Sequence, residues 1–329
     1  MAYSWCYRSL FRPLSLFLLL AGTVVGQSLD DVKIVPRIEN PKVPAAEDAL
    51  EAHVKPLRVD VDLVLVPVTV TDAQGNPAMD LARSDFKLFE GEEEQKVQYF
   101  YAEDAPVSVG LIVDLSSSMA NKLDRVRQAV AEFFQNADPD DDYFVITFSD
   151  KPELLADTTQ SVETIEAELG NVNPAGGTPL LDAIYLGLDK LKHARYQRRA
   201  LLIISDGGDN TSRYRAKEIR EIAQESDAQI YAMGIFSPLT IAIEDRRGKK
   251  LLSEITDATG GRSVFLSSPD RLPKVSADFS RELRSQYVLG YRPKDLLRDG
   301  RPHKITVKLN AGMTHSMRVY YKRQYIAFR

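Results

Sequence analysis

The stretch that decides the fold is Val107-Ser108-Val109-Gly110-Leu111-Ile112-Val113-Asp114-Leu115-Ser116-Ser117-Ser118-Met119. Its first half is a short, nearly continuous apolar run, which is typical of a strand buried on both faces of a parallel sheet. A carboxylate and two hydroxyls then follow at alternate positions, Asp114, Ser116 and Ser118, just before a helical pattern that begins near Asn121. These side chains can converge on one point, and hard divalent cations such as Mg²⁺ prefer an oxygen-rich shell of this kind.

The spacing Asp-x-Ser-x-Ser at the end of a buried strand resembles the metal-ion-dependent adhesion site (MIDAS) of von Willebrand factor type A (VWA) domains. Two later segments strengthen the resemblance. Gly176-Gly177-Thr178-Pro179-Leu180 resembles the second metal loop of that family, with Thr178 at the threonine position. Leu202-Ile203-Ile204-Ser205-Asp206-Gly207 resembles the third loop, in which a buried strand ends at the acidic ligand Asp206. All three segments occur in the order of the family.

The resemblance implies a metal site and a way of using it. The implied ligands are three hydroxyls and two carboxylates, with the carboxylates holding the ion directly or through water: Ser116, Ser118, Thr178, Asp114 and Asp206. The expected cofactor is a divalent cation, Mg²⁺ first, with Mn²⁺ and Ca²⁺ as alternatives. The expected partner is a protein that offers an exposed Asp or Glu to the bound ion. Ser117 stands where many relatives have glycine, at a position that supplies no ligand.

Strands and helices alternate in the pattern from residue 105 onward, which favours an α/β fold with a mostly parallel, doubly wound sheet. We expect this VWA domain to cover residues 105–284. The flanking segments, residues 58–104 and 285–329, have strand patterning and no helix to cover it. We therefore expect the two flanking segments to pair into one small β-sandwich. Two stretches of the first segment, residues 68–77 and 84–91, resemble the region before the VWA domain in a family of secreted bacterial proteins.

The N-terminus has the pattern of a targeting segment. Arg8 and Arg12 precede an apolar run from Leu14 to Val25, which predicts a signal peptide over residues 1–26 with cleavage after Gly26. An uncleaved anchor is the alternative. Residues 27–57 contain scattered charges and four prolines and are predicted to be an extended linker. We expect an exported protein, periplasmic or secreted.

Composition narrows the classes of partner. The chain has 329 residues, of which 44% are hydrophobic and 27% charged, and its formal net charge is −5. That balance argues against a nucleic-acid binder and against a protein that binds anionic membranes. No segment after the leader is apolar enough to span a bilayer. The single cysteine, Cys6, lies before the apolar run, so the mature chain would have no disulfide.

Two other functions compete with a metal-dependent binding module. A hydrolase could use Asp114 or Ser116 as nucleophile. However, no histidine falls at a predicted strand end of the VWA domain, and neither a Gly-x-Ser-x-Gly elbow nor a phosphate-binding loop is present. A structural envelope component could retain the loops without metal, with the Ser and Asp residues serving only as helix caps and turn formers. Asn210-Thr211-Ser212 fits a glycosylation triplet, but Asp209 and Asn210 are better explained as residues that shape the rim of the third loop.

Overall fold

The computed structural model describes residues 63–326 except 104, 158–161, 172–173, 237–242, 294–299, 311 and 313–315. The predicted signal peptide and linker lie outside the described residues. Among the described residues, no helix combines the length and apolar character that crossing a bilayer would require.

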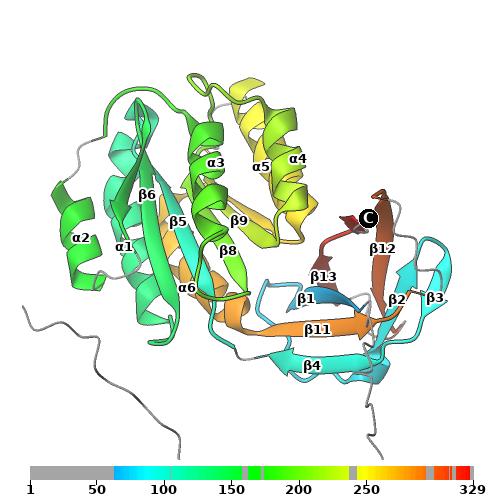
Figure 1. Cartoon of the computed structure of the whole chain (residues 1–329). Helices are drawn as coiled ribbons and strands as arrows, with labels where there is room; N and C mark the ends of the chain where they lie inside the picture. The colour runs from blue at the N-terminus through cyan, green and yellow to red at the C-terminus, as the bar shows by residue number, and fades with distance from the viewer. Residues whose placement is uncertain are drawn as a thin grey trace, which may run out of the picture. The chain divides into compact units, whose positions relative to one another are not determined.

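A six-stranded sheet forms the centre of the α/β part, in the order β10-β9-β8-β5-β6-β7 (Figure 1). All neighbours in it are parallel except β6 and β7. The strands are β5 (Ser108–Asp114), β6 (Asp142–Phe148), β7 (Pro152–Ala156), β8 (Arg199–Ser205), β9 (Ala228–Ile235) and β10 (Ser263–Leu266). Every residue of β5 and β9 is buried, which agrees with their continuous apolar sequence.

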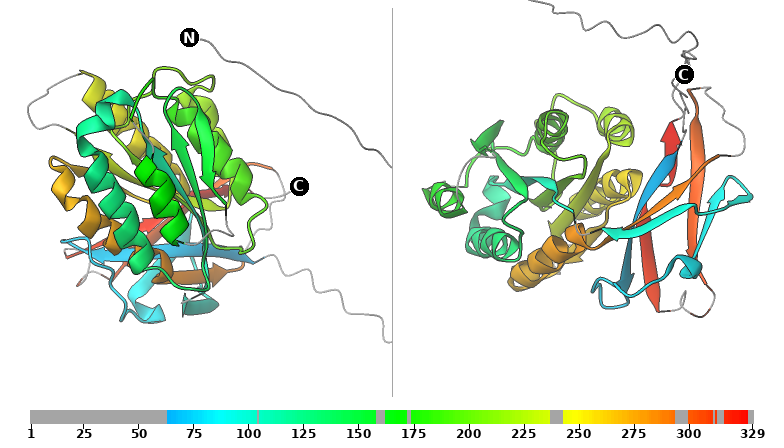
Figure 2. Two further views of the ribbon diagram at one scale, coloured as in Figure 1. Left: turned by 90° about the vertical axis from the view of Figure 1, so that its left-hand side faces the viewer. Right: turned by 60° about the horizontal axis from the view of Figure 1, so that its bottom comes forward.

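Helices cover both faces of this sheet (Figure 2). One face packs against α1 (Leu123–Gln135), α2 (Val162–Asn171) and α6 (Leu272–Arg284). The other face packs against α3 (Leu180–Leu191), α4 (Ala216–Glu225) and α5 (Ile243–Thr259). Two short 3₁₀ segments complete this part, η2 (Ser117–Lys122) and η3 (Pro269–Arg271). The doubly wound sheet predicted from the sequence is therefore confirmed.

The flanking strands form two four-stranded antiparallel sheets, in the orders β13-β1-β11-β4 and β14-β12-β2-β3. Their bounds are β1 (Val64–Asp72), β2 (Phe86–Glu90), β3 (Glu93–Gln95), β4 (Tyr99–Glu103), β11 (Gln286–Tyr291), β12 (Pro302–Leu309), β13 (Met317–Tyr321) and β14 (Gln324–Ile326), with η1 (Arg83–Asp85) before β2. β1 pairs with β11 and β13, and β2 pairs with β12. Each of the two sheets thus contains strands from before and from after the α/β part, as the fold prediction required.

The two sheets enclose an apolar core of their own, in which the rings of Phe86, Phe100 and Tyr287 lie 5.2–5.8 Å apart between centroids. Arg262, just before β10, links this sandwich to the α/β part. Its guanidinium donates to the carbonyl of Gly75, in the turn after β1, and lies 5.6 Å from the ring of Tyr320 in β13. The linking side chain is itself held by the buried carboxylate of Glu282 in α6, at 2.8 Å.

Three details differ from the sequence expectation. The helix expected near Asn121 is preceded by the 3₁₀ segment η2, and α1 begins at Leu123. The apolar residues Leu251, Leu252 and Ile255 predict a helix from the sequence, and helix α5 begins at Ile243, about two turns before the first of them. β14 was not predicted, because its three residues are too few to display an alternating pattern.

Candidate metal site

The sheet topology creates a crevice between β5 and β8. These strands are parallel neighbours, with Val113 opposite Ile204 in the register. The helix after β5 packs on one face of the sheet and the helix after β8 packs on the other, so the two chains diverge at their carboxyl ends. Ligands of doubly wound sheets bind at such a switch point. Asp114 ends β5, and Asp206 directly follows β8.

Four of the five predicted ligands, Ser116, Ser118, Thr178 and Asp206, line one cleft of about 970 Å³ at this crevice. The fifth, Asp114, does not line the cleft and is fully buried beneath it. Its Oδ1 accepts a 2.9 Å hydrogen bond from the backbone N–H of Ser116. The structure therefore brings all five residues to one place, with Asp114 behind the hydroxyls.

The hydroxyls of Ser116 and Ser118 are 3.1 Å apart. Two adjacent ligands of an octahedral Mg²⁺, each about 2.1 Å from the ion, are separated by about 3.0 Å. The spacing of these two hydroxyls thus fits neighbouring positions in a magnesium shell. Within the described ranges, no group of three or more His, Cys, Asp or Glu side chains is placed to hold a metal ion. Any ion held here would therefore depend on hydroxyl oxygens as well as on carboxylates.

Burial governs the ionisation of Asp114. It raises the pKa of this carboxyl to about 6, hydrogen bonds from Ser116 and Ser205 oppose the rise, and the nearby charge of Asp206 adds to it. Asp114 and Asp206 thus repel one another when both are ionised. A cation between them would relieve that repulsion, which is the electrostatic condition for a metal site.

The second loop is fixed by backbone contacts on both sides. The N–H of Ala175 donates to the carbonyl of Leu115 at 3.0 Å, and the N–H of Gly177 donates to the carboxylate of Asp150 at 3.0 Å. Gly176 has a φ of +77°, and a Cβ there would meet the Asp150 side chain at 2.3 Å. Only glycine fits that position.

Asn210 connects the second and third loops. Its side-chain Oδ1 accepts from the N–H of Thr178 at 2.8 Å, and its own N–H donates to the carbonyl of Thr178 at 3.1 Å. The interpretation of Asn210 as a residue that shapes the loop rim is confirmed by these contacts. Its side-chain oxygen is thus engaged in positioning a predicted ligand.

Two further residues at the site had no role in the sequence analysis. Ser205 lies beneath the cleft and donates to Asp114 Oδ2 at 2.6 Å. Lys122 places its ammonium 3.3 Å from Asp206 Oδ2. Ser205 could have been noticed because it immediately precedes Asp206 in a strand. Lys122 carries no sequence signal, since a lysine at the start of a helix is ordinarily exposed to solvent.

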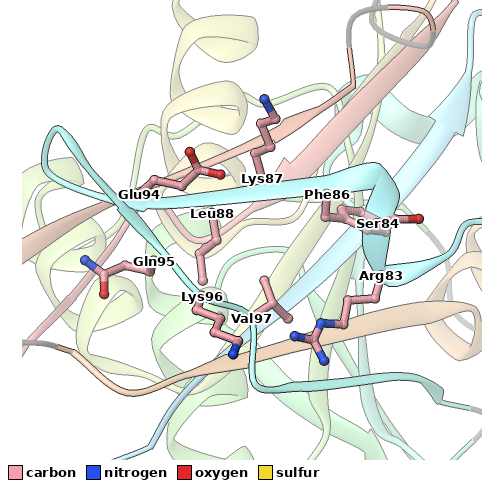
Figure 3. A pocket seen from close by; sticks show the side chains of 9 residues that line it. All are labelled: Arg83, Ser84, Phe86, Lys87, Leu88, Glu94, Gln95, Lys96 and Val97. Carbon is pink, nitrogen blue, oxygen red and sulfur yellow. The ribbon is translucent and has the colours of Figure 1, made fainter.

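A separate pocket of about 430 Å³ lies on the sandwich, between η1, β2 and β3 (Figure 3). Arg83 and Lys96 flank Val97 in it, and Leu88 lies between the strands that form it. None of the five predicted metal ligands lines this pocket. The predicted metal ligands thus belong to the cleft at the carboxyl ends of β5 and β8.

Comparison with known proteins agrees with the fold. The model of the von Willebrand factor type A domain family matches residues 109–208, so the chain contains a VWA domain. An uncharacterized protein of Borreliella burgdorferi is 21% identical over 221 residues, 59% of this chain and 64% of that protein. The magnesium-chelatase 67 kDa subunit of Chlorobaculum tepidum is 27% identical over 240 residues, 66% of this chain and 38% of that subunit. The chain thus spans less than two thirds of each of these relatives.

Solved structures with a similar fold include a von Willebrand factor type A protein from Catenulispora acidiphila. It has 12% identity and a TM-score of 0.47, over 76% of this chain and 75% of that one. An aerotolerance-related membrane protein from Bacteroides fragilis has 18% identity and a TM-score of 0.44, over 54% of this chain and 98% of that one. At these identities and TM-scores, no property of either protein is carried over to this chain.

Proposed function

We propose that this protein is a metal-dependent protein-binding module of the bacterial cell envelope. In this proposal Ser116, Ser118 and Thr178 supply hydroxyl ligands, and Asp114 and Asp206 supply the negative charge. When bound, the cation supplies a Lewis-acidic coordination position that a carboxylate of the partner can occupy. The observation that carries the proposal is the convergence of these residues at one cleft, with two of their hydroxyls at the separation of adjacent magnesium ligands.

The position of the Asp114 carboxylate supports a role for the cation as a bridge to a partner. Both oxygens of Asp114 are engaged by donors of the protein, the N–H of Ser116 and the hydroxyl of Ser205. Asp114 is thereby held as a buried negative charge behind the cleft, while Ser118 is an exposed residue that lines the cleft. A cation held mainly by neutral hydroxyls retains more of its charge for an incoming carboxylate.

We favour binding over catalysis because both candidate nucleophiles, Asp114 and Ser116, are buried. The described residues that line the cleft include no histidine and no cysteine. Ser116 is nearly fully buried, and the carboxylate that its side chain contacts, Asp114, is fully buried and already engaged by Ser205. The exported location belongs to the proposal as well and is supported by the pattern of residues 1–26.

Calorimetric titration with Mg²⁺ tests the metal site. The wild type is expected to bind the ion, and Asp114→Ala and Thr178→Ala are expected to lose binding while unfolding cooperatively. Ser117→Ala is the matched control. Its hydroxyl donates to the carbonyl of Gly176 at 3.2 Å, and it lies between two ligands without being one. A wild type that takes up no Mg²⁺ would favour the structural alternative, in which the loops serve only as caps and turns.

A second experiment tests the bridge. The immobilised protein is exposed to cell-envelope extract with Mg²⁺, and the captured proteins are compared with those retained in excess EDTA. The bridge predicts a partner that is released by the chelator and is not captured by Thr178→Ala. Capture that persists unchanged in EDTA contradicts this mechanism.

A further inference from the structure

We propose that Lys122 tunes this site: its ammonium restrains cation binding and keeps the bound cation attractive to a partner's carboxylate. The inference rests on the proposed function and concerns a residue outside the ligand set. It starts from one contact, the 3.3 Å separation between Lys122 Nζ and Asp206 Oδ2.

The position of Lys122 follows from local structure. It ends η2, the 3₁₀ segment that begins at Ser117 in the first metal loop. This turn carries the lysine from the first loop toward the third, where it meets Asp206. The ammonium also lies 3.7 Å from the sulfur of the buried Met119. The first loop thus supplies both a hydroxyl ligand, Ser118, and a positive charge at the same site.

The environment makes this ion pair stronger than an ordinary surface pair. The side chains of Lys122 and Asp206 are 18% and 19% exposed. Exposed pairs contribute little because water screens the charges and both side chains must be ordered. Here the surrounding loops already restrict both groups, and partial burial lowers the effective dielectric constant. The charge of Lys122 therefore acts on Asp206 with less screening than at an exposed site.

The charge balance gives the consequence. When ionised, Asp114 and Asp206 neutralise a divalent cation, so that these two carboxylates and the cation together carry no net charge. Lys122, which contacts Asp206, brings the formal charge of this group to plus one. This excess positive charge favours an incoming carboxylate. Repulsion between the ammonium of Lys122 and the cation weakens uptake of the cation. One residue therefore shifts the two binding steps in opposite directions, which a residue with a purely structural role does not do.

The test replaces Lys122 by Met, which keeps an unbranched side chain and removes the charge. Mg²⁺ affinity is measured by calorimetry, and acetate serves as the probe carboxylate on Mn²⁺-loaded protein, followed by the relaxation of water protons. We expect Lys122→Met to bind Mg²⁺ about tenfold more tightly. Acetate should bind the loaded variant about threefold more weakly than it binds the loaded wild type.

Two controls separate charge from structure. Lys122→Arg keeps the charge and should resemble the wild type in both measurements. Lys151→Met removes a lysine that is 76% exposed and pairs with Glu153 at 2.7 Å, outside the cleft, and should change neither affinity. Thermal unfolding of all the variants without metal establishes that they are folded.

The outcomes distinguish this inference from the proposed function. A wild type that takes up no Mg²⁺ overturns both. If the wild type binds Mg²⁺ and the folded Lys122→Met variant binds it with equal or lower affinity, the inference alone is overturned. Tighter Mg²⁺ binding together with unchanged or stronger acetate binding also overturns it, because the charge would then not act on the partner's side.

Discussion

Ser205 Oγ donates a 2.6 Å hydrogen bond to Asp114 Oδ2 and thereby joins the ends of β8 and β5. The same hydroxyl oxygen accepts from the N–H of Gly207 at 2.9 Å. Ser205 is fully buried, so neither contact is replaced by solvent. One side chain therefore orients the buried carboxylate of the first metal loop and the backbone of the third.

Replacing Ser205 by Ala should weaken both folding and metal binding. The change leaves a buried carboxylate oxygen and a backbone N–H without partners, at a cost of about 1–3 kcal/mol in the free energy of unfolding. Because Asp114 also loses its orientation, Mg²⁺ affinity should fall. Urea unfolding and calorimetry measure the two effects. Unfolding and Mg²⁺ binding that both match the wild type would show that this hydrogen bond orients nothing.

Gly248 in α5 should be required for the geometry of the third loop. A Cβ at this position would lie 2.9 Å from the carbonyl oxygen of Asp206 and 3.0 Å from that of Gly207. Gly248→Ala should therefore push the loop away from α5 and reduce Mg²⁺ affinity. Gly170→Ala in α2 is the control, since a Cβ there meets nothing within 4 Å. Equal Mg²⁺ affinities in the two variants would contradict the prediction.

The buried pair of Arg262 and Glu282 should be important for stability. Glu282 is fully buried and Arg262 is 7% exposed. Glu282→Ala leaves the guanidinium buried without its carboxylate, and we expect a loss of about 3–5 kcal/mol. Replacing both residues by apolar side chains, Arg262→Met with Glu282→Leu, should recover much of that loss. Denaturant unfolding checks both, and a double variant no more stable than Glu282→Ala would argue against this explanation.

The contact between Asp138 and Arg284 should make stability depend on pH in the acid range. The hydrogen bond from Arg284 holds the pKa of Asp138 below its ordinary value of 3.8. A lowered folded-state pKa contributes stability above the unfolded-state pKa, and this contribution is lost as the pH falls through the folded-state value. The wild type should therefore exceed Arg284→Met in stability at neutral pH, and the difference should narrow below pH 3.8. Thermal unfolding at several pH values measures it, and a difference that does not vary with pH would contradict the assignment.

The sequence by itself determined the α/β class, the flanking strands and the candidate ligands. Buried parallel strands are continuous apolar runs, and this one-dimensional signal is strong at β5. The ligand candidates follow from the ends of such strands, because the carboxyl ends of parallel strands meet at one edge of a sheet. Asp114 and Asp206 could therefore be named before their positions were known.

Only the tertiary structure decided what surrounds those ligands. Lys122 and Asp206 are 84 residues apart in the chain, and Arg262 and Gly75 are 187 residues apart, so no local pattern connects either pair. The residue at which α5 begins was also decided by packing, because the first turns of α5 lie beside the third metal loop at Gly248. Local periodicity reports which face of an element is buried. Which charges meet is set by the register and crossing of distant elements, because electrostatic and hydrogen-bond energies depend on separations that the order of residues does not contain.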